Sequence, residues 1–255
     1  MASNRKVRDF WIACVCTSVL LANFVLDALP TAAAEPKTAD ATYGTPKIDA
    51  EIEPMWGKTP VVHTNRQVKG VSTLPPQDAA RAKVRVLWDE QHLYVLCEVE
   101  DSRLSATGAE LWQHDSVEVF IDENNSKAGQ FDGDDCQYRV NYQGKMSGGR
   151  SYQPGAMVAK VREIEGGYVV ELAIKLRVKV EEDGKQLGFD IQVNDDAGSG
   201  IRESIMKWCD RTDRSWYDTS GYGTLELRKN AVVGDEDKTK NNGNEAQSSE
   251  SSVNG

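Results

Sequence analysis

The stretch Leu187-Gly-Phe-Asp-Ile-Gln-Val193 alternates apolar and polar residues. Successive side chains of a β-strand point to opposite faces, so this pattern predicts a strand with one apolar and one polar face. Similar segments recur along the chain between turns rich in Gly, Asn and Asp, whereas no long segment shows the 3.6-residue period of a helix. The expected strands are 83–88, 93–99, 116–122, 136–142, 168–176, 187–193, 206–208 and 224–228, and a short turn near 49–56 is the best helix candidate.

Many short strands without helices between them are typical of two packed sheets. We therefore predict an all-β fold, an antiparallel β-sandwich of jelly-roll type in a single domain over residues 43–228. A domain of about 185 residues is long enough to bury one well-formed core.

The two ends of the chain differ from this middle part in composition. Residues 1–34 combine three basic residues near the start, an apolar run at 11–26 and small residues at 30–34. This order predicts a secretory signal peptide and a secreted protein without membrane contact after cleavage, with an uncleaved anchor as the alternative. We expect residues 35–42 to form a short polar leader and residues 229–255 a disordered linker or tail.

The charge and the cysteines narrow the classes of partner. A formal net charge of −10 disfavours polyanions, so we expect no nucleic-acid partner and favour neutral ligands and cations. Cys97, Cys136 and Cys209 follow the predicted cleavage site, and we expect small buried thiols, with one disulfide left open. The sequence has no CxxC, GxSxG, HExxH, P-loop or GxGxxG motif.

Polar side chains of several expected strands share one face of the sheet. By strand parity, Glu118, Arg139 and Gln192 point away from their apolar neighbours, and Asn194 has the parity of Gln192. A carboxylate accepts hydrogen bonds, a guanidinium donates them and amides do both, so this face can bind hydroxyl groups. A merely solvated outer face is the alternative.

Two tryptophans lie in polar segments beside these strands. Trp112 precedes Gln-His-Asp, and Trp216 follows Arg-Thr-Asp-Arg-Ser, whereas Trp88 and Trp208 fit strands and are expected in the core. An aromatic face can pack against the C–H groups of a sugar ring, so Trp112 and Trp216 are candidates for sugar binding. Partial core packing is the alternative for each.

Carboxylates also occur together in several loops, at 49–51, 101, 132–135 and 195–196. Such oxygen ligands suit Ca²⁺ in a secreted protein, although acidic loops are often only solvated. A glycosidase pair is disfavoured, because Asp115 and Glu118 have opposite parity and Glu118 and Asp122 are about 13 Å apart on an extended strand.

A further set of motifs occurs in order along residues 43–228. They are 43–52, 82–90, 93–96, Trp112 with 115–118, 120–125, 137–142, 165–168, 188–195 and 215–216. Together they resemble a family 9 carbohydrate-binding module, above all those attached to bacterial family 10 xylanases. The resemblance implies a calcium-containing β-sandwich that binds the reducing ends of cellulose and xylan chains, and hence cellobiose and xylobiose.

The resemblance also implies roles for individual residues. Trp112 and Trp216 would enclose the terminal sugar, Glu118 and Arg139 would form its hydrogen bonds, and Gln192 and Asn194 would be neighbours. Asp213 stands where the family pattern has an asparagine, and since a carboxylate only accepts hydrogen bonds, the ligand preference is left open. The expected calcium ligands are, as first choice, Asp49, Glu51 and Asp101, and as second choice, Asp132, Asp134 and Asp135.

The sequence therefore predicts a secreted, non-catalytic module that binds oligosaccharides or polysaccharides. Alternatives are a fragment of a modular endo-1,4-β-xylanase whose linked catalytic domain is absent from this chain, and an intrinsic glycoside hydrolase. A calcium-stabilised adhesion or haem-binding sandwich is a third, but His63, His92 and His114 offer no convincing pair of haem ligands.

Overall fold

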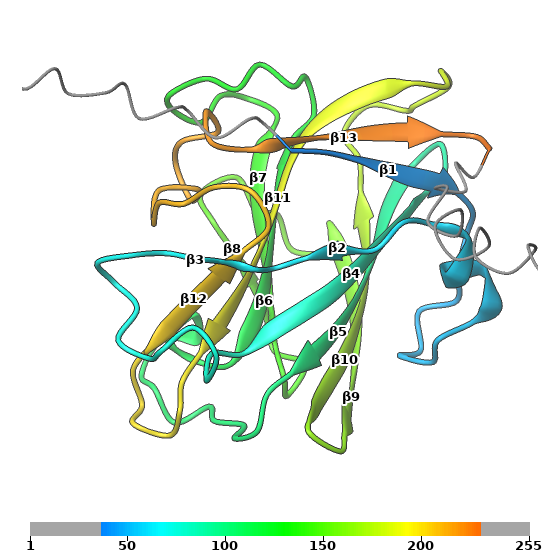
Figure 1. Ribbon diagram of the computed structural model, residues 1–255. Coiled ribbons are helices and arrows are strands. Elements are labelled where there is room, and N and C mark those ends of the chain that lie inside the picture. The colour runs from blue at the N-terminus through cyan, green and yellow to red at the C-terminus, as the bar shows by residue number, and fades with distance from the viewer. Residues whose placement is uncertain (1–36, 231–255) are drawn as a thin grey trace, which may run out of the picture. The chain divides into compact units, whose positions relative to one another are not determined.

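Thirteen strands and two short 3-10 helices make up residues 37–230, the part of the chain that the computed structural model describes (Figure 1). The helices are η1 (Pro54–Lys58) and η2 (Leu111–Gln113). The strands are β1 (Thr38–Tyr43), β2 (Val62–His63), β3 (Arg66–Gln67), β4 (Arg81–Trp88), β5 (His92–Glu100), β6 (Ser116–Asp122), β7 (Asp135–Asn141), β8 (Met146–Gly148), β9 (Met157–Ile164), β10 (Gly167–Lys175), β11 (Lys185–Asp195), β12 (Ser204–Lys207) and β13 (Gly223–Arg228).

The strands form two layers that β1 connects. Their order is β8-β7-β6-β11-β13-β1-β4-β5-β10-β9, with β12 and β3 beside β11 and β2 beside β4. The apolar sides of both layers meet in one core, where Val117 and Val119 of β6 share a cluster with Val95 and Val99 of β5. The predicted all-β sandwich is thus confirmed, and each predicted strand corresponds to an observed one.

The N-terminal boundary of the domain differs from the prediction. Residues 38–43, most of which were expected to belong to a polar leader, form strand β1, which pairs in parallel with β13 and with the end of β4 (Figure 1). Ala39 and Ala41 supply its apolar side, and Ala41 is fully buried. Because alanine gives only a weak hydrophobic signal, the apolar–polar alternation of residues 38–43 does not stand out in the sequence. These parallel pairings also mean that the sheet is not purely antiparallel.

The core contains the aromatic and sulfur-bearing residues expected there. Trp88 and Trp208 are buried, as predicted. Cys97, Cys136 and Cys209 are buried free thiols, so the simpler of the two predictions for the cysteines is confirmed.

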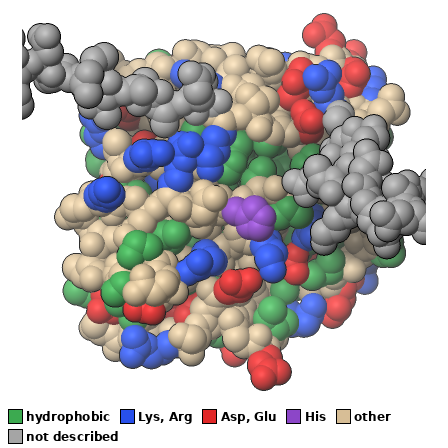
Figure 2. Space-filling model, in the orientation of Figure 1, with side chains coloured by type: hydrophobic (Ala, Val, Ile, Leu, Met, Phe, Trp, Pro, Cys, Tyr) green, Lys and Arg blue, Asp and Glu red, His purple; other side chains and the backbone are tan. Residues whose placement is uncertain are grey.

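The surface carries both signs of charge. The face shown in Figure 2 carries a group of basic side chains at the upper left and acidic side chains at the upper right and toward the bottom. None of the helices within residues 37–230 has the length and apolar composition needed to cross a membrane. The predicted signal peptide and the predicted tail from residue 231 onward lie outside the described residues.

Candidate functional site

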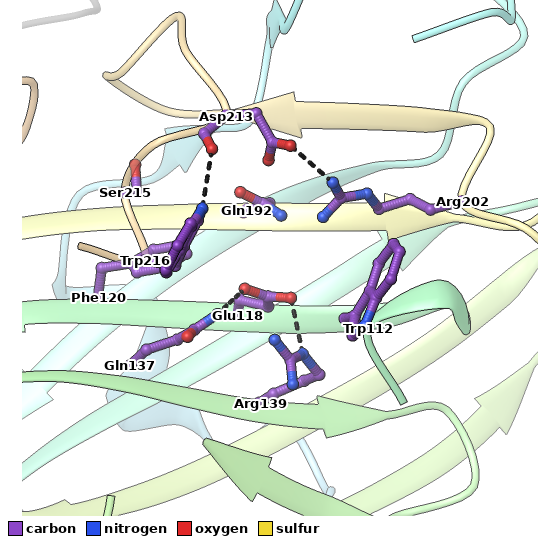
Figure 3. A pocket seen from close by; sticks show the side chains of 10 residues that line it. All are labelled: Trp112, Glu118, Phe120, Gln137, Arg139, Gln192, Arg202, Asp213, Ser215 and Trp216. Atoms are coloured by element: carbon purple, nitrogen blue, oxygen red, sulfur yellow. Dashed lines mark hydrogen bonds and ion pairs between the residues drawn. The ribbon is translucent and has the colours of Figure 1, made fainter. Parts of the chain in front are cut away.

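A cavity of about 390 Å³ opens over the polar face of β6, β7 and β11. The strand register explains why, because Glu118 of β6 lies opposite Arg139 of β7 on one side and Gln192 of β11 on the other. Strand parity predicts one shared face for these three side chains, and in the structure they lie together (Figure 3). The cavity is lined by Trp112, Glu118, Phe120, Gln137, Arg139, Gln192, Arg202, Asp213, Ser215 and Trp216.

Glu118 is the centre of the cavity floor and is almost fully buried. Its Oε1 accepts hydrogen bonds from Arg139 Nε and Asn194 Nδ2, each at 2.7 Å, and its Oε2 accepts one from Gln137 Nε2. Burial by itself raises the pKa of Glu118, but the positive charge of Arg139 and these hydrogen bonds outweigh it, so the pKa lies below its ordinary value. The carboxylate is therefore ionised and fixed in position.

Trp112 and Trp216 rise on either side of this floor (Figure 3). They are 41 % and 53 % exposed, which is unusual for tryptophan and shows that neither serves mainly as a core residue. Trp112 is the central residue of η2, whose ends are tied by reciprocal hydrogen bonds between Glu110 and Gln113. The segment around Trp112 was expected to be a loop and is instead a short helical turn.

The loop that carries Trp216 is held by a buried lysine that sequence reasoning missed. Lys207 of β12 is inaccessible to solvent, and its Nζ donates to Asp210 Oδ2 (3.1 Å), Thr212 O (3.0 Å) and Ser215 Oγ. A buried ammonium group with three partners fixes the loop that folds over it. No pattern in the sequence indicates this role, because the partners come from the loop itself.

Arg202 lines the cavity itself, and the sequence did not indicate its role either. It lies in the irregular segment between β11 and β12, with its guanidinium carbon 5.1 Å from the centre of the Trp112 ring. Its Nη2 donates to Asp213 Oδ2 at 2.9 Å. Asp213 in turn accepts a hydrogen bond from Trp216 Nε1 at its backbone oxygen (3.1 Å). Arg202 and Asp213 thus connect the two tryptophans.

Gln192 and Asn194, the two amides predicted as neighbours of the ligand, differ in their access to the cavity. Gln192 lines the cavity, whereas Asn194 is fully buried behind it and does not belong to the lining. Asn194 donates to Glu118 and Ser116 and accepts from Gln192 Nε2 (2.6 Å). The structure therefore places Asn194 next to Glu118 but not on the cavity surface, where it holds the carboxylate in position.

Acidic side chains outside the cavity form two clusters within residues 37–230, and the first contains Asp101, Asp115 and Asp195. One carboxylate oxygen of each lies within 4.8 Å of the others. Burial, and then the charge of Asp101, raise the pKa of Asp115 to about 8, and burial raises that of Asp195 to about 6. Oδ2 of Asp101 is buried and has no hydrogen-bond partner among the described residues. Converging oxygen donors of this kind fit a divalent cation.

Asp49 and Glu51, which were predicted to join Asp101, do not lie there. The backbone N–H of Asp49 donates to Glu171 Oε2 (2.9 Å), and both acidic side chains form ion pairs with basic neighbours. Glu171 is opposite Leu96 of β5, five residues before Asp101. Five residues of extended strand span about 16 Å, which is too far for a shared ion.

The second cluster contains Asp122, Asp134 and Asp135, so it includes two of the three residues of the second predicted set. Asp122 at the end of β6 lies directly opposite Asp135 at the start of β7, which is why it takes the place expected for Asp132. Asp132 instead accepts a hydrogen bond from the backbone of Asp134 (3.2 Å). Burial raises the pKa of Asp135 to about 6, and its buried Oδ1 has no partner among the described residues.

Comparison with known proteins adds sequence and structural relatives. The profile of the family described as "Carbohydrate family 9 binding domain-like" matches residues 48–230. Endo-1,4-beta-xylanase A of Thermotoga maritima is 45 % identical over 191 residues, which cover 75 % of this chain but only 18 % of that enzyme. The chain thus spans about a fifth of the length of this xylanase.

Two solved structures resemble the fold closely. Both are family 9 carbohydrate-binding modules from Caldicellulosiruptor kristjanssonii, one in complex with cellotriose and one with glucose. The first has a TM-score of 0.69 and 31 % identity, covering 77 % of this chain and 96 % of that structure. The second has a TM-score of 0.69 and 30 % identity, covering 78 % and 100 %. By the extent of these matches, this chain belongs to the carbohydrate family 9 binding domain-like family.

Proposed function

We propose that this chain binds β-1,4-linked glucan and xylan oligosaccharides, with one sugar ring held between Trp112 and Trp216. The observation that carries the proposal is the pair of exposed tryptophans on either side of a floor of fixed hydrogen-bonding groups (Figure 3). The flat faces of a pyranose present C–H groups that pack on aromatic rings, and its rim presents hydroxyls. The two tryptophans complement the C–H faces of the sugar ring, and the polar floor complements its hydroxyls.

The floor offers acceptors and donors of strong hydrogen bonds. Glu118 keeps one lone pair, on Oε2, for a sugar hydroxyl, and Nη2 of Arg139 has no partner among the described residues. Gln192 adds an amide on the other side of Glu118. Ionised partners form roughly twice as strong a hydrogen bond as neutral ones, so Glu118 and Arg139 would orient the ring.

The known complexes support oligosaccharides as ligands, because the two similar modules were solved with cellotriose and glucose. We further propose that the bound ring is the reducing end of a cellulose or xylan chain, as the resemblance implies. A cavity that encloses one ring between two walls suits the end of a chain better than its middle.

The cavity supports binding rather than catalysis. A general acid for glycoside hydrolysis needs a raised pKa, but that of Glu118 is lowered, and its oxygens are engaged by Arg139, Asn194 and Gln137. A role as one module of a longer secreted xylanase, joined to a catalytic domain, is the second candidate, since the matched relative is a xylanase of which this chain covers 18 %.

We also propose that Ca²⁺ binds the two acidic clusters. The residues fit, because each cluster brings three carboxylates together and each holds one buried carboxylate oxygen without a partner, on Asp101 and on Asp135. A divalent cation would supply positive charge that balances the three neighbouring carboxylates and keeps them ionised. Asp115 precedes β6 and Asp122 ends it, so the two ions would fix both ends of the strand that carries Glu118.

Isothermal calorimetry on residues 35–230 tests the proposal. The ligands are glucose, cellobiose, xylobiose and cellobiitol, in which the reducing end is opened by reduction. We expect cellobiose and glucose to bind and cellobiitol to bind far more weakly. Equal binding of cellobiose and cellobiitol would refute recognition of the reducing end, and release of reducing sugar from xylan would refute a non-catalytic role.

A further inference from the structure

A second cavity, of about 570 Å³, lies against the same tryptophan wall. Two of its residues, Gln137 and Trp216, also line the proposed sugar cavity, so the two cavities adjoin at these side chains. The second cavity is lined by Gln130, Phe131, Gln137, Gly149, Arg150, Trp216 and Tyr217.

One wall of this cavity is aromatic and is held by backbone contacts. The ring of Tyr217 packs edge-on against Trp216, with ring centres 4.4 Å apart and planes at 69°. Phe131 lies beside them, and its backbone N–H donates to the backbone oxygen of Tyr217 at 2.8 Å. Ala128 accepts two more hydrogen bonds from Thr219, so the two loops that form the wall are fastened together.

The lining of the second cavity also has a polar part, which is joined to the floor of the first cavity. The side-chain Nε2 of Gln137 donates to Glu118 Oε2, and the backbone oxygen of Gln137 accepts a hydrogen bond from the backbone N–H of Gly149 at 3.0 Å. A β-carbon on Gly149 would lie 2.7 Å from Gln137 Oε1, so a side chain at this position would displace the Gln137 amide. The next residue, Arg150, also lines the second cavity.

Arg150 differs from the other two arginines of the site. Arg139 is paired with Glu118 and Arg202 with Asp213, whereas Arg150 is exposed and forms no ion pair or side-chain hydrogen bond within residues 37–230. In a chain with a net charge of −10, an unpaired guanidinium beside aromatic rings is suited to a carboxylate of a ligand.

From these contacts we propose that the second cavity is a subsite for a uronic acid branch of the bound oligosaccharide. The main-chain ring lies between Trp112 and Trp216, the branch sugar packs on Trp216 and Tyr217, and its carboxylate pairs with Arg150. This inference rests on the proposed function, because the branch reaches the subsite only when the first cavity holds the chain.

Calorimetry with a matched pair of ligands tests the subsite. The pair is xylotriose and xylotriose that carries one glucuronic acid branch. We expect the parent protein to bind the acidic ligand about fivefold more tightly, as is typical of a partly exposed ion pair. Arg150→Gln should remove this preference and leave xylotriose binding unchanged, and Arg150→Lys should keep part of it.

The control is Lys160→Gln, which removes an exposed positive charge on β9. If Lys160→Gln also removes the preference, the effect is one of net charge and the subsite is refuted. Xylotriose binding without any preference for the acidic ligand would overturn the subsite alone. Failure of both ligands, and of cellobiose and glucose, would instead refute the proposed function.

Discussion

Replacing Trp112 by alanine should weaken cellobiose binding by roughly 70-fold. With 41 % of the side chain exposed, and roughly 250 Å² for a whole tryptophan, about 100 Å² of ring is accessible. A stacked sugar would cover about half of this and lose a similar area of its own C–H surface. At about 25 cal/mol per Å², the roughly 100 Å² removed from water corresponds to about 2.5 kcal/mol, or roughly 70-fold in affinity.

The fold should tolerate this change. Trp112 belongs to neither of the two core clusters, so its removal leaves no cavity among the buried residues. We expect a loss of less than about 1 kcal/mol in the free energy of unfolding, as for most surface substitutions. Thermal unfolding of the variant therefore separates a lost ligand contact from a damaged fold.

Isothermal calorimetry with cellobiose is the assay, and Trp112→Phe is the matched variant, because it keeps a smaller aromatic face. We expect the affinities to rank parent, then Trp112→Phe, then Trp112→Ala. If Trp112→Ala binds cellobiose as tightly as the parent while it unfolds at the same temperature, Trp112 is not a wall of the site and the reasoning fails.

Three other predictions concern the floor, the bridge between the walls and the acidic clusters. Glu118 has a lowered pKa when folded, so its pairing with Arg139 is complete above the unfolded value of 4.5 and is lost as the pH falls through the lower folded value. Cellobiose affinity should therefore be flat from about pH 5 to about pH 8 and fall only below about pH 4.5, and a fall at acid pH that persists in Glu118→Gln would contradict this. Asp213→Asn should release Arg202 toward the ligand and add a donor, giving about threefold tighter cellobiose binding in calorimetry, whereas weaker binding would show that the ion pair itself shapes the site. Chelation with EDTA should lower the unfolding temperature by about 5 to 10 °C for each ion lost, relative to protein with Ca²⁺ at about a hundredfold excess over its Kd. Asp101→Asn should reduce the difference by the share of the first cluster, and an unchanged difference would show that this cluster binds no metal.

Local patterns in the sequence were sufficient to predict eight of the thirteen strands and the polar floor, but not β1, β2, β3, β8 and β9. The alternation in 116–122 fixes both the strand β6 and the direction of Glu118, since a strand side chain has only two faces to choose from. The same parity applied to Arg139 and Gln192 gave their shared face. Gln137 has the parity of Arg139 and could have been found by the same signal.

Contacts between distant segments were not predictable in the same way. Arg202 reaches the cavity from an irregular segment, and Lys207 acquires its role only from the loop that covers it. The acidic clusters show the same limit, because Asp115 and Asp195 approach each other only once β6 has paired with β11. The sequence indicated acidic loops but not the sets of carboxylates that the register brings together.

The floor and the walls of the site contribute to binding in different ways. Glu118 is held by three donors before any sugar arrives, so ordering it on binding costs little conformational entropy. Trp112 and Trp216 keep large exposed faces in the free protein, and covering these faces provides most of the apolar area that binding removes from water. Substitutions in the floor should therefore change mainly which hydroxyl arrangement is accepted, and substitutions in the walls should weaken all sugars alike. Calorimetry of Gln192→Ala and Trp216→Ala against glucose and xylose separates the two effects: only the Gln192 variant should change the ratio of the two affinities.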